Sequence, residues 1–176
     1  MNRTAVLFAL MVALVVTSAH AQAGPATSGS AATACTRAAT LDELIKALDD
    51  AVSGPGNKDR TCLRELLLPD ARLTPVSKTP DGKLAPHHLS VDDWINAVAR
   101  RGAEPFYERQ VKVTSHQYGH IAQLWSEYEI RPTPEGEATL RGVNSIQAFY
   151  DGSQWKVVAI LWEAENTAGA APGNKP

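Results

Sequence analysis

The sequence predicts an α+β fold in which N-terminal helices pack on one face of a strongly curved antiparallel sheet. Two observations predict it. Apolar residues recur at helical spacing between Leu41 and Val98, whereas from Phe106 onward apolar and polar residues alternate at the period of a strand. Helices that come first and strands that come last are typical of α+β domains rather than of alternating α/β domains.

Capping signals mark two helices in the first half of the chain. The stretch "TLDE" at Thr40 begins an amphipathic helix that Gly54 ends, and "SVDD" at Ser90 begins another. Between them we expect a shorter helix over residues 58–68. The stretch "LPDARL" that follows predicts an extended segment. The prolines of residues 75–89 then predict an irregular or hairpin-like excursion.

The second half of the chain predicts a four-stranded antiparallel meander. Its turns are "QYG", "PTPEG" and "YDGS", each with a glycine where a positive φ is needed. The expected strands are residues 106–115, 120–131, 140–150 and 154–163.

The N-terminal residues predict export. Arg3, the apolar run 5–16 and the small-residue pattern Ala19-His20-Ala21 are typical of a secretory signal peptide over residues 1–21. The run is too short to span a membrane as a helix, and an uncleaved anchor is the alternative. We therefore expect an exported protein, periplasmic or secreted, without a membrane span.

Composition sets the boundaries of the mature domain. Residues 22–34 are rich in Ala, Gly, Ser and Thr, which predicts a flexible linker, and residues 167–176 have the character of a disordered tail. The folded domain is therefore expected over residues 35–166.

The chain has two cysteines, Cys35 and Cys62, which can pair in only one way. In an oxidising compartment we expect them to form a disulfide that joins the segment before the first helix to the second helix. Closing a loop of that length stabilises a fold by roughly 3 kcal/mol in the chain-entropy model. Two separately buried thiols are the alternative.

The formal net charge of −2, with acids and bases interspersed, argues against a nucleic-acid or membrane-surface partner. No phosphate-cradling glycine loop or nucleophile elbow occurs in the sequence, so we expect no cofactor. His87, His88, His116 and His120 lack the spacing of metal ligands, and we expect no metal site.

Three stretches resemble the nuclear transport factor 2-like superfamily, also called SnoaL-like or ketosteroid-isomerase-like. They are "PDARL" at 69–73, "GHIAQLWSEYEI" at 119–130 and "DGSQWKV" at 151–157. The resemblance covers the mature domain and implies a cone-shaped, cystatin-like α+β roll. Its helices close the open side of a bent sheet around a cavity that serves as an active site or a binding pocket. The resemblance also implies a homodimer formed through the outer sheet face, where Trp125 would be exposed.

The isomerase-type members of that superfamily have a catalytic aspartate shortly after the "DA" of the exit segment and a tyrosine on the first helix. Here Arg72 to Val76 follow Asp70-Ala71 and contain no carboxylate, and the helix that begins at Leu41 contains no tyrosine. Proton abstraction next to a carbonyl needs both a base and an oxyanion donor. We therefore assign no catalytic residue, and the sequence favours a protein without that activity.

Alternation predicts which side chains line the cavity, provided that no β-bulge reverses a strand. The predicted ligand-binding residues are Trp94 of the third helix and five strand residues, Tyr107, Arg109, Tyr128, Asn144 and Glu163. An Arg109–Glu163 ion pair would satisfy both charges without a ligand. A role of some of these polar groups in orienting a ligand is the alternative.

Three functions remain open from the sequence. The first is an exported domain that binds a small apolar or amphipathic molecule or acts as an accessory module. The second is a SnoaL-like isomerase, cyclase or hydrolase that uses Glu163 or a histidine as its base. The third is an interaction module whose cavity is filled by Arg109 and Glu163.

Overall fold

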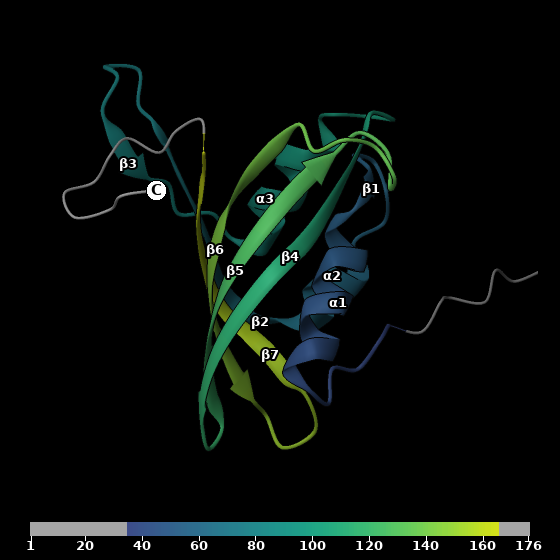
Figure 1. The fold of residues 1–176 in the computed structure, drawn as a ribbon, viewed down its shortest axis with the longest axis vertical. Helices are drawn as coiled ribbons and strands as arrows, with labels where there is room; N and C mark the ends of the chain where they lie inside the picture. The colour runs from purple at the N-terminus through teal and green to yellow at the C-terminus, as the bar shows by residue number, and fades with distance from the viewer. Residues whose placement is uncertain (1–34, 166–176) are drawn as a thin grey trace, which may run out of the picture. The chain divides into compact units, whose positions relative to one another are not determined.

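The computed structural model describes residues 35–165, in which three helices cover one face of a bent, seven-stranded sheet (Figure 1). The helices are α1 (Leu41–Val52), α2 (Thr61–Leu66) and α3 (Val91–Ala99). The strands are β1 (Gly54–Pro55), β2 (Leu67–Lys78), β3 (Leu84–Pro86), β4 (Pro105–Tyr118), β5 (Ile121–Arg131), β6 (Leu140–Tyr150) and β7 (Trp155–Ala164). The predicted α+β class is confirmed. The predicted signal peptide 1–21, linker 22–34 and tail 167–176 lie outside the described residues.

Both predicted helix caps are present. The Thr40 hydroxyl accepts from the Glu43 backbone N–H while the Glu43 carboxylate accepts from the Thr40 backbone N–H, and Ser90 and Asp93 do the same at α3. Each box satisfies backbone donors that have no partner inside the helix. The entry angles of α1 and α3, which both face the sheet, are thereby fixed locally.

The sheet is mixed, whereas the sequence predicted an antiparallel one. Strands β4 to β7 form the expected antiparallel meander, but the segment after α2 is the long strand β2, which pairs parallel to β7. The strand order is β1-β4-β5-β6-β7-β2-β3, and β3 pairs back on β2 around Gly82, whose φ is +80°. The predicted hairpin-like excursion is this β2–β3 hairpin.

The core lies between the helices and the inner face of the sheet. Leu44 and Leu48 of α1 and Leu63 and Leu66 of α2 pack with Leu124, Ile146 and Val157 of the sheet, all of them 5% exposed or less. No helix among residues 35–165 is long and apolar enough to cross a membrane.

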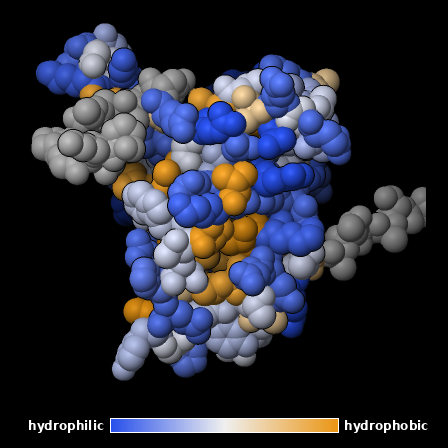
Figure 2. All heavy atoms as spheres, in the orientation of Figure 1, coloured by the Kyte–Doolittle hydropathy of each residue, from blue (hydrophilic) through white to orange (hydrophobic). Residues whose placement is uncertain are grey.

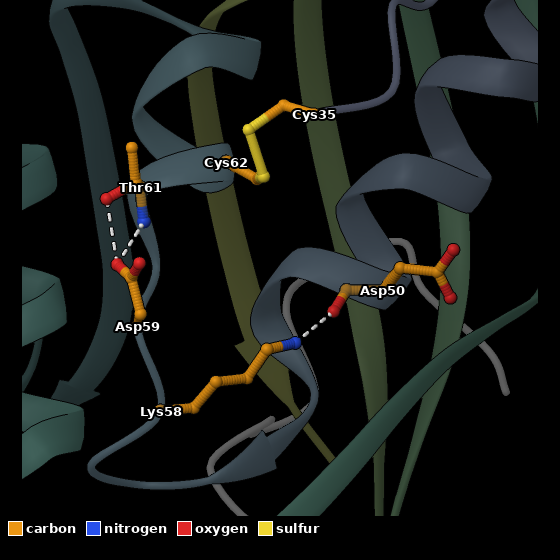
Figure 3. The surroundings of a disulfide bond; sticks show 6 residues. All are labelled: Cys35, Asp50, Lys58, Asp59, Thr61 and Cys62. Carbon is orange, nitrogen blue, oxygen red and sulfur yellow. Dashed lines mark hydrogen bonds between the residues drawn. A yellow bond between two sulfur atoms is a disulfide. The ribbon is translucent and has the colours of Figure 1, made fainter. Parts of the chain in front are cut away.

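The predicted disulfide is present between Cys35 and Cys62 (Figure 3). It joins the segment that precedes α1 to the first turn of α2. Nearby, Lys58 donates to the Asp50 carbonyl and Asp59 accepts from the backbone and hydroxyl of Thr61. The bridge and these short contacts hold α2 next to α1.

Arg60 is a buried cation that the sequence did not mark. It is 2% exposed, and its guanidinium donates to the carbonyl oxygens of Val52, Pro55, Gly56 and Lys58 at 2.7–3.2 Å. The guanidinium carbon also lies 5.8 Å from the Trp94 ring centroid. Because Arg60 satisfies carbonyls at the end of α1 and also contacts α3, it fixes the two helices around one point.

Candidate functional site

A cavity of about 460 Å³ lies between the helices and the inner face of the sheet. Its walls are mainly apolar and include Leu48, Leu67, Trp94, Ile146, Ile160 and Trp162. Two of its lining residues, Arg101 and Thr139, are exposed, so the cavity reaches the surface beside them. This size and lining are ordinary for a small-molecule pocket.

The structure brings three of the predicted ligand-binding residues to this cavity and not the other three. Trp94, Tyr128 and Asn144 line it. Tyr107 and Arg109 line a second, polar pocket at the edge of β4, beside Asp49 of α1 and Lys58 of the loop before α2, and Glu108 lines both pockets. Glu163 lies on the outer face of β7, opposite Val143 and on the same face as the exposed Leu161.

The face assignments of Tyr107, Arg109 and Glu163 were wrong because two strands contain bulges. The register of β4 shifts between Gln110 and Lys112, and that of β7 shifts between the partners of Gln147 and Ala148. An extra residue reverses which side chains face inward from that point on. Upstream of the first bulge the inward residues are Phe106, Glu108 and Gln110, and downstream of the second they are Ile160, Trp162 and Ala164.

The predicted Arg109–Glu163 ion pair is absent from the described residues. Arg109 is exposed, and neither side chain lines the cavity. The interpretation of this domain as a module whose cavity is filled by its own ion pair is therefore wrong.

The polar end of the cavity is built around Glu108. Gln110 Nε2 donates to Glu108 Oε1 at 2.9 Å, and Asn144 Nδ2 donates to the same oxygen at 3.2 Å. Asn144 also donates to Gln110 Oε1, which accepts a further short hydrogen bond from the buried Ser126 hydroxyl. The two amides hold one carboxylate oxygen of Glu108, so the orientation of its side chain is fixed.

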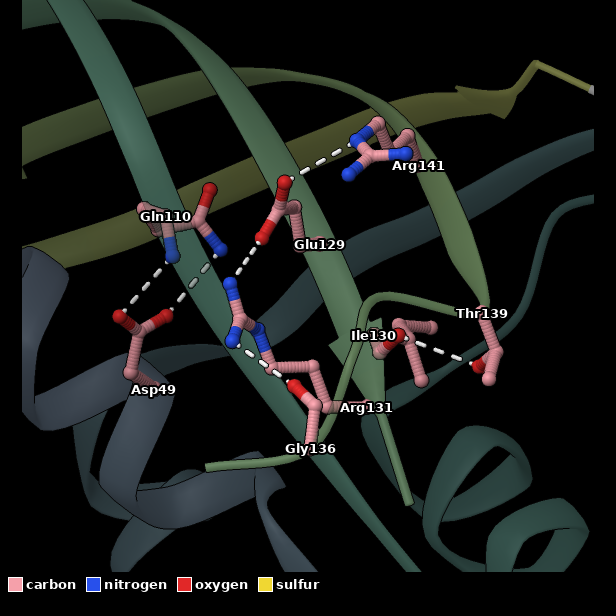
Figure 4. A network of polar contacts seen from close by, with 8 residues as sticks. All are labelled: Asp49, Gln110, Glu129, Ile130, Arg131, Gly136, Thr139 and Arg141. Carbon is pink, nitrogen blue, oxygen red and sulfur yellow. Dashed lines mark hydrogen bonds and ion pairs between the residues drawn. The ribbon is translucent and has the colours of Figure 1, made fainter. Parts of the chain in front are cut away.

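Gln110 extends this network out of the cavity to α1. Its backbone N–H and its Nε2 donate to the two carboxylate oxygens of Asp49 at 3.1 and 3.2 Å (Figure 4). Asp49 lines the polar pocket at the β4 edge. A single side-chain amide thus bridges Glu108, which lines both the cavity and the polar pocket, and Asp49, which lines the polar pocket alone.

Burial shifts the pKa values of these groups. Desolvation raises the pKa of Glu108 to about 7, with a further contribution from the charge of Asp49, and desolvation raises the pKa of Asp49 to about 6. Desolvation and the charge of Glu108 raise the pKa of Tyr128 to about 12. At neutral pH the Tyr128 hydroxyl is therefore protonated, while the Glu108 carboxyl is close to half ionised.

Tyr128 lies across a glycine. A Cβ built on Gly142 would lie 2.6 Å from the Tyr128 hydroxyl oxygen, which is closer than any side chain tolerates. Gly142 is opposite Tyr128 in the β5–β6 pairing, so the absence of a side chain there lets the Tyr128 ring lie against β6. The tyrosine is 3% exposed and lines the cavity.

A second charged cluster lies near the cavity without lining it. Glu129 binds Arg131 and also Arg141, and Arg131 Nη1 donates to the Gly136 carbonyl at 2.8 Å (Figure 4). These contacts tie the β5–β6 connection to the sheet. Among residues 35–165, Glu108 is the one carboxylate that lines the cavity.

Sequence reasoning missed Glu108 and Gln110 as cavity residues. A signal for them existed, because alternation puts the apolar Phe106 on the same face of the strand as Glu108 and Gln110. Val111 and Val113, however, suggested that the other face is the inner one. Neither position of the isomerase-type catalytic pair is filled by a carboxylate or a tyrosine. Among residues 35–165, no cluster of His, Cys, Asp and Glu has the arrangement of a metal site.

Solved structures with the same architecture come from several bacteria. One is an NTF-2 like protein of unknown function from Silicibacter pomeroyi, with 18% identity, coverage of 71% of this chain and 92% of that chain, and a TM-score of 0.50. Another is an NTF2-like protein of unknown function from Pseudomonas putida, with 14% identity, coverage of 77% and 91%, and a TM-score of 0.51. The chain has the nuclear transport factor 2-like fold.

A protein of unknown function with a cystatin-like fold from Nostoc punctiforme is similar as well, with 11% identity, coverage of 78% of this chain and 98% of that chain, and a TM-score of 0.51. At these identities the likeness concerns the fold alone. No family model and no curated protein matches the chain. The nuclear transport factor 2-like fold predicted from the sequence motifs is thus confirmed. Any inference about function has to come from the cavity.

Proposed function

We propose that this domain binds a small amphipathic molecule in the cavity between its helices and its sheet. The observation that carries the proposal is the cavity itself, about 460 Å³ with mainly apolar walls and one polar end at Glu108, Asn144 and Tyr128. A well-formed apolar cavity with a few convergent polar groups is the usual form of a small-molecule site. Its position between α1, α3 and the sheet keeps the bound molecule out of water.

The test is to fill the cavity with a larger side chain. Val98 lines the cavity from α3, and Val98→Trp would place an indole in it. We expect the affinity for the neutral fluorophore N-phenyl-naphthylamine, measured by fluorescence titration, to fall by about tenfold or more, or about 1.4 kcal/mol. Val158→Trp is the matched control, because Val158 is exposed at the β7 bulge and does not line the cavity. Equal binding by both variants and the wild type would contradict the proposal.

A second candidate is an enzyme of the SnoaL-like kind, and Glu108 is the observation that favours it. A cavity carboxyl with a pKa near 7 beside a protonated tyrosine has the groups that acid–base catalysis requires. Glu108 then replaces Glu163 as the candidate base. Solvent deuterium appearing in a bound ketone with the wild type, and not with Glu108→Gln, would favour the enzyme over simple binding.

The outer face of the sheet supports a homodimer. Ile121, Trp125, Phe149 and Leu161 lie on it with 61%, 52%, 39% and 47% of their surface exposed. Figure 2 shows apolar side chains near the centre of the view, surrounded by hydrophilic ones. We infer that a second copy of the chain covers this outer face. The face carries paired charges of both signs, such as Lys112 with Glu127, so two copies can meet without net repulsion between like charges. A monomer mass in light scattering would contradict this.

Export is part of the same proposal. The disulfide Cys35–Cys62 is of the kind that persists in oxidising compartments. It supports the periplasmic or secreted location that the sequence of residues 1–21 predicts.

A further inference from the structure

The hydrogen-bonding groups at the polar end of the cavity are unevenly divided between acceptors and donors. Glu108 Oε1 accepts from Gln110 and Asn144, whereas its second oxygen, Oε2, has no hydrogen bond among residues 35–165. Both hydrogens of Asn144 Nδ2 are used, and Asn144 Oδ1 accepts none within the same part of the chain. Three residues that line the cavity therefore carry two free acceptors, Glu108 Oε2 and Asn144 Oδ1, and one hydroxyl, that of Tyr128.

No cation of the described chain pairs with Glu108. The cavity-lining cation is Arg101, which lies 5.3 Å from the Phe106 ring centroid and pairs with Glu104 at the exposed rim. The guanidinium carbon of Arg60 lies 5.8 Å from the Trp94 ring centroid and 5.9 Å from that of Phe106, and the guanidinium donates its hydrogen bonds to backbone carbonyls. A carboxylate in an apolar cavity without a positive partner is unfavourable, and a ligand that carries the positive charge removes this cost.

From these contacts we infer that the ligand is an apolar molecule carrying a protonated amine, which binds with its nitrogen at Glu108 Oε2 and Asn144 Oδ1. An ammonium group donates several hydrogen bonds and carries the charge that Glu108 lacks. Trp162, whose ring contacts no cation of the described chain, adds an aromatic wall of the kind that attracts ammonium groups. This inference rests on the proposed binding function and names its ligand class.

The experiment uses calorimetry at pH 8 to compare three probes that each have an eight-carbon chain: octylamine, octanol and octanoate. Wild-type protein should bind octylamine about tenfold or more tightly than octanol, and octanoate the least tightly. Glu108→Gln keeps an acceptor for both amides and removes the charge, so octylamine should lose about tenfold or more while octanol is unchanged. Glu163→Gln is the matched control, because it removes a carboxylate from the outer face and should alter no affinity.

The outcomes separate the ligand class from the cavity function. If octanol binds and octylamine has no advantage, or if octanoate binds the most tightly, the ligand class is wrong and the cavity proposal stands. If octylamine binds equally to wild type and Glu108→Gln, the role of Glu108 is wrong. Octanol binding also shows that Glu108→Gln has folded, and a failure of all three probes to bind wild type would overturn both proposals.

Discussion

At the scale of single residues, Glu108 is the side chain whose chemistry is most altered by the fold. It is half-buried, its Oε1 is held by two amides, and desolvation is the main reason its pKa is raised to about 7. The amide hydrogen bonds favour the ionised form and limit this rise. The carboxyl is therefore held in place while its charge responds to conditions near neutrality.

The raised pKa of Glu108 makes the stability of the domain depend on pH. Because the folded pKa lies near 7 and the ordinary value is 4.5, the stability contributed by the protonated carboxyl is complete below pH 4.5 and is lost as the pH rises to about 7. The loss is at most roughly 3 kcal/mol. Between pH 5 and pH 8, urea unfolding should show a smaller decrease in the free energy of unfolding for Glu108→Gln than for wild type.

The pKa of Asp49 is raised to about 6, so Asp49 also makes the fold less stable as the pH rises. The contribution of Glu108 is therefore the difference in pH dependence between wild type and Glu108→Gln. Glu163→Gln should keep the wild-type pH dependence. An identical pH dependence for Glu108→Gln and wild type would mean that Glu108 is solvated in the folded protein.

At the scale of secondary-structure elements, the helices were more predictable than the strands. The caps at Thr40 and Ser90 are local, so four residues were enough to place the start of each of α1 and α3. The bulges in β4 and β7 carry no local signature, because Val111 and Val158 are ordinary strand residues rather than glycines. Alternation therefore placed Tyr128 and Asn144 correctly and placed Arg109 and Glu163 on the wrong face.

Arg60 is the clearest test at this scale, because it joins α1, the following loop and α3. Arg60→Leu would leave the buried carbonyl of Gly56 and the partly buried carbonyls of Val52 and Pro55 without this donor, and should lower the free energy of unfolding by roughly 3 kcal/mol or more. Arg60→Lys should recover only part of this, because an ammonium cannot reach several carbonyls in one plane. Urea denaturation measures both.

The control for Arg60 is Arg100→Leu, which changes an exposed arginine at the end of α3. A surface change of this kind should alter stability by no more than about 0.5 kcal/mol. Similar stabilities for Arg60→Leu and Arg100→Leu would show that the carbonyls around Arg60 find other partners.

At the scale of the whole domain, the order of elements and the disulfide could be predicted from the sequence, whereas the extension of the sheet by β2 could not. The pairing of β2 with β7 joins segments far apart in the chain, and no local pattern around "LLPDARL" specifies a parallel partner. This pairing places Leu73 of β2 beside Ile160 of β7. Both residues line the cavity, as do Leu67 of β2 and Trp162 of β7, so the pairing completes its apolar wall.

The most direct test of a ligand site inside the cavity compares two tryptophans in one ¹H–¹⁵N NMR titration of the protein with octylamine. Trp162 lines the cavity, and Trp125 is 52% exposed on the outer face of the sheet. Binding in the cavity predicts that the indole N–H resonance of Trp162 shifts with saturation while that of Trp125 stays in place. A shift at Trp125 alone, or no shift at Trp162, would contradict the account.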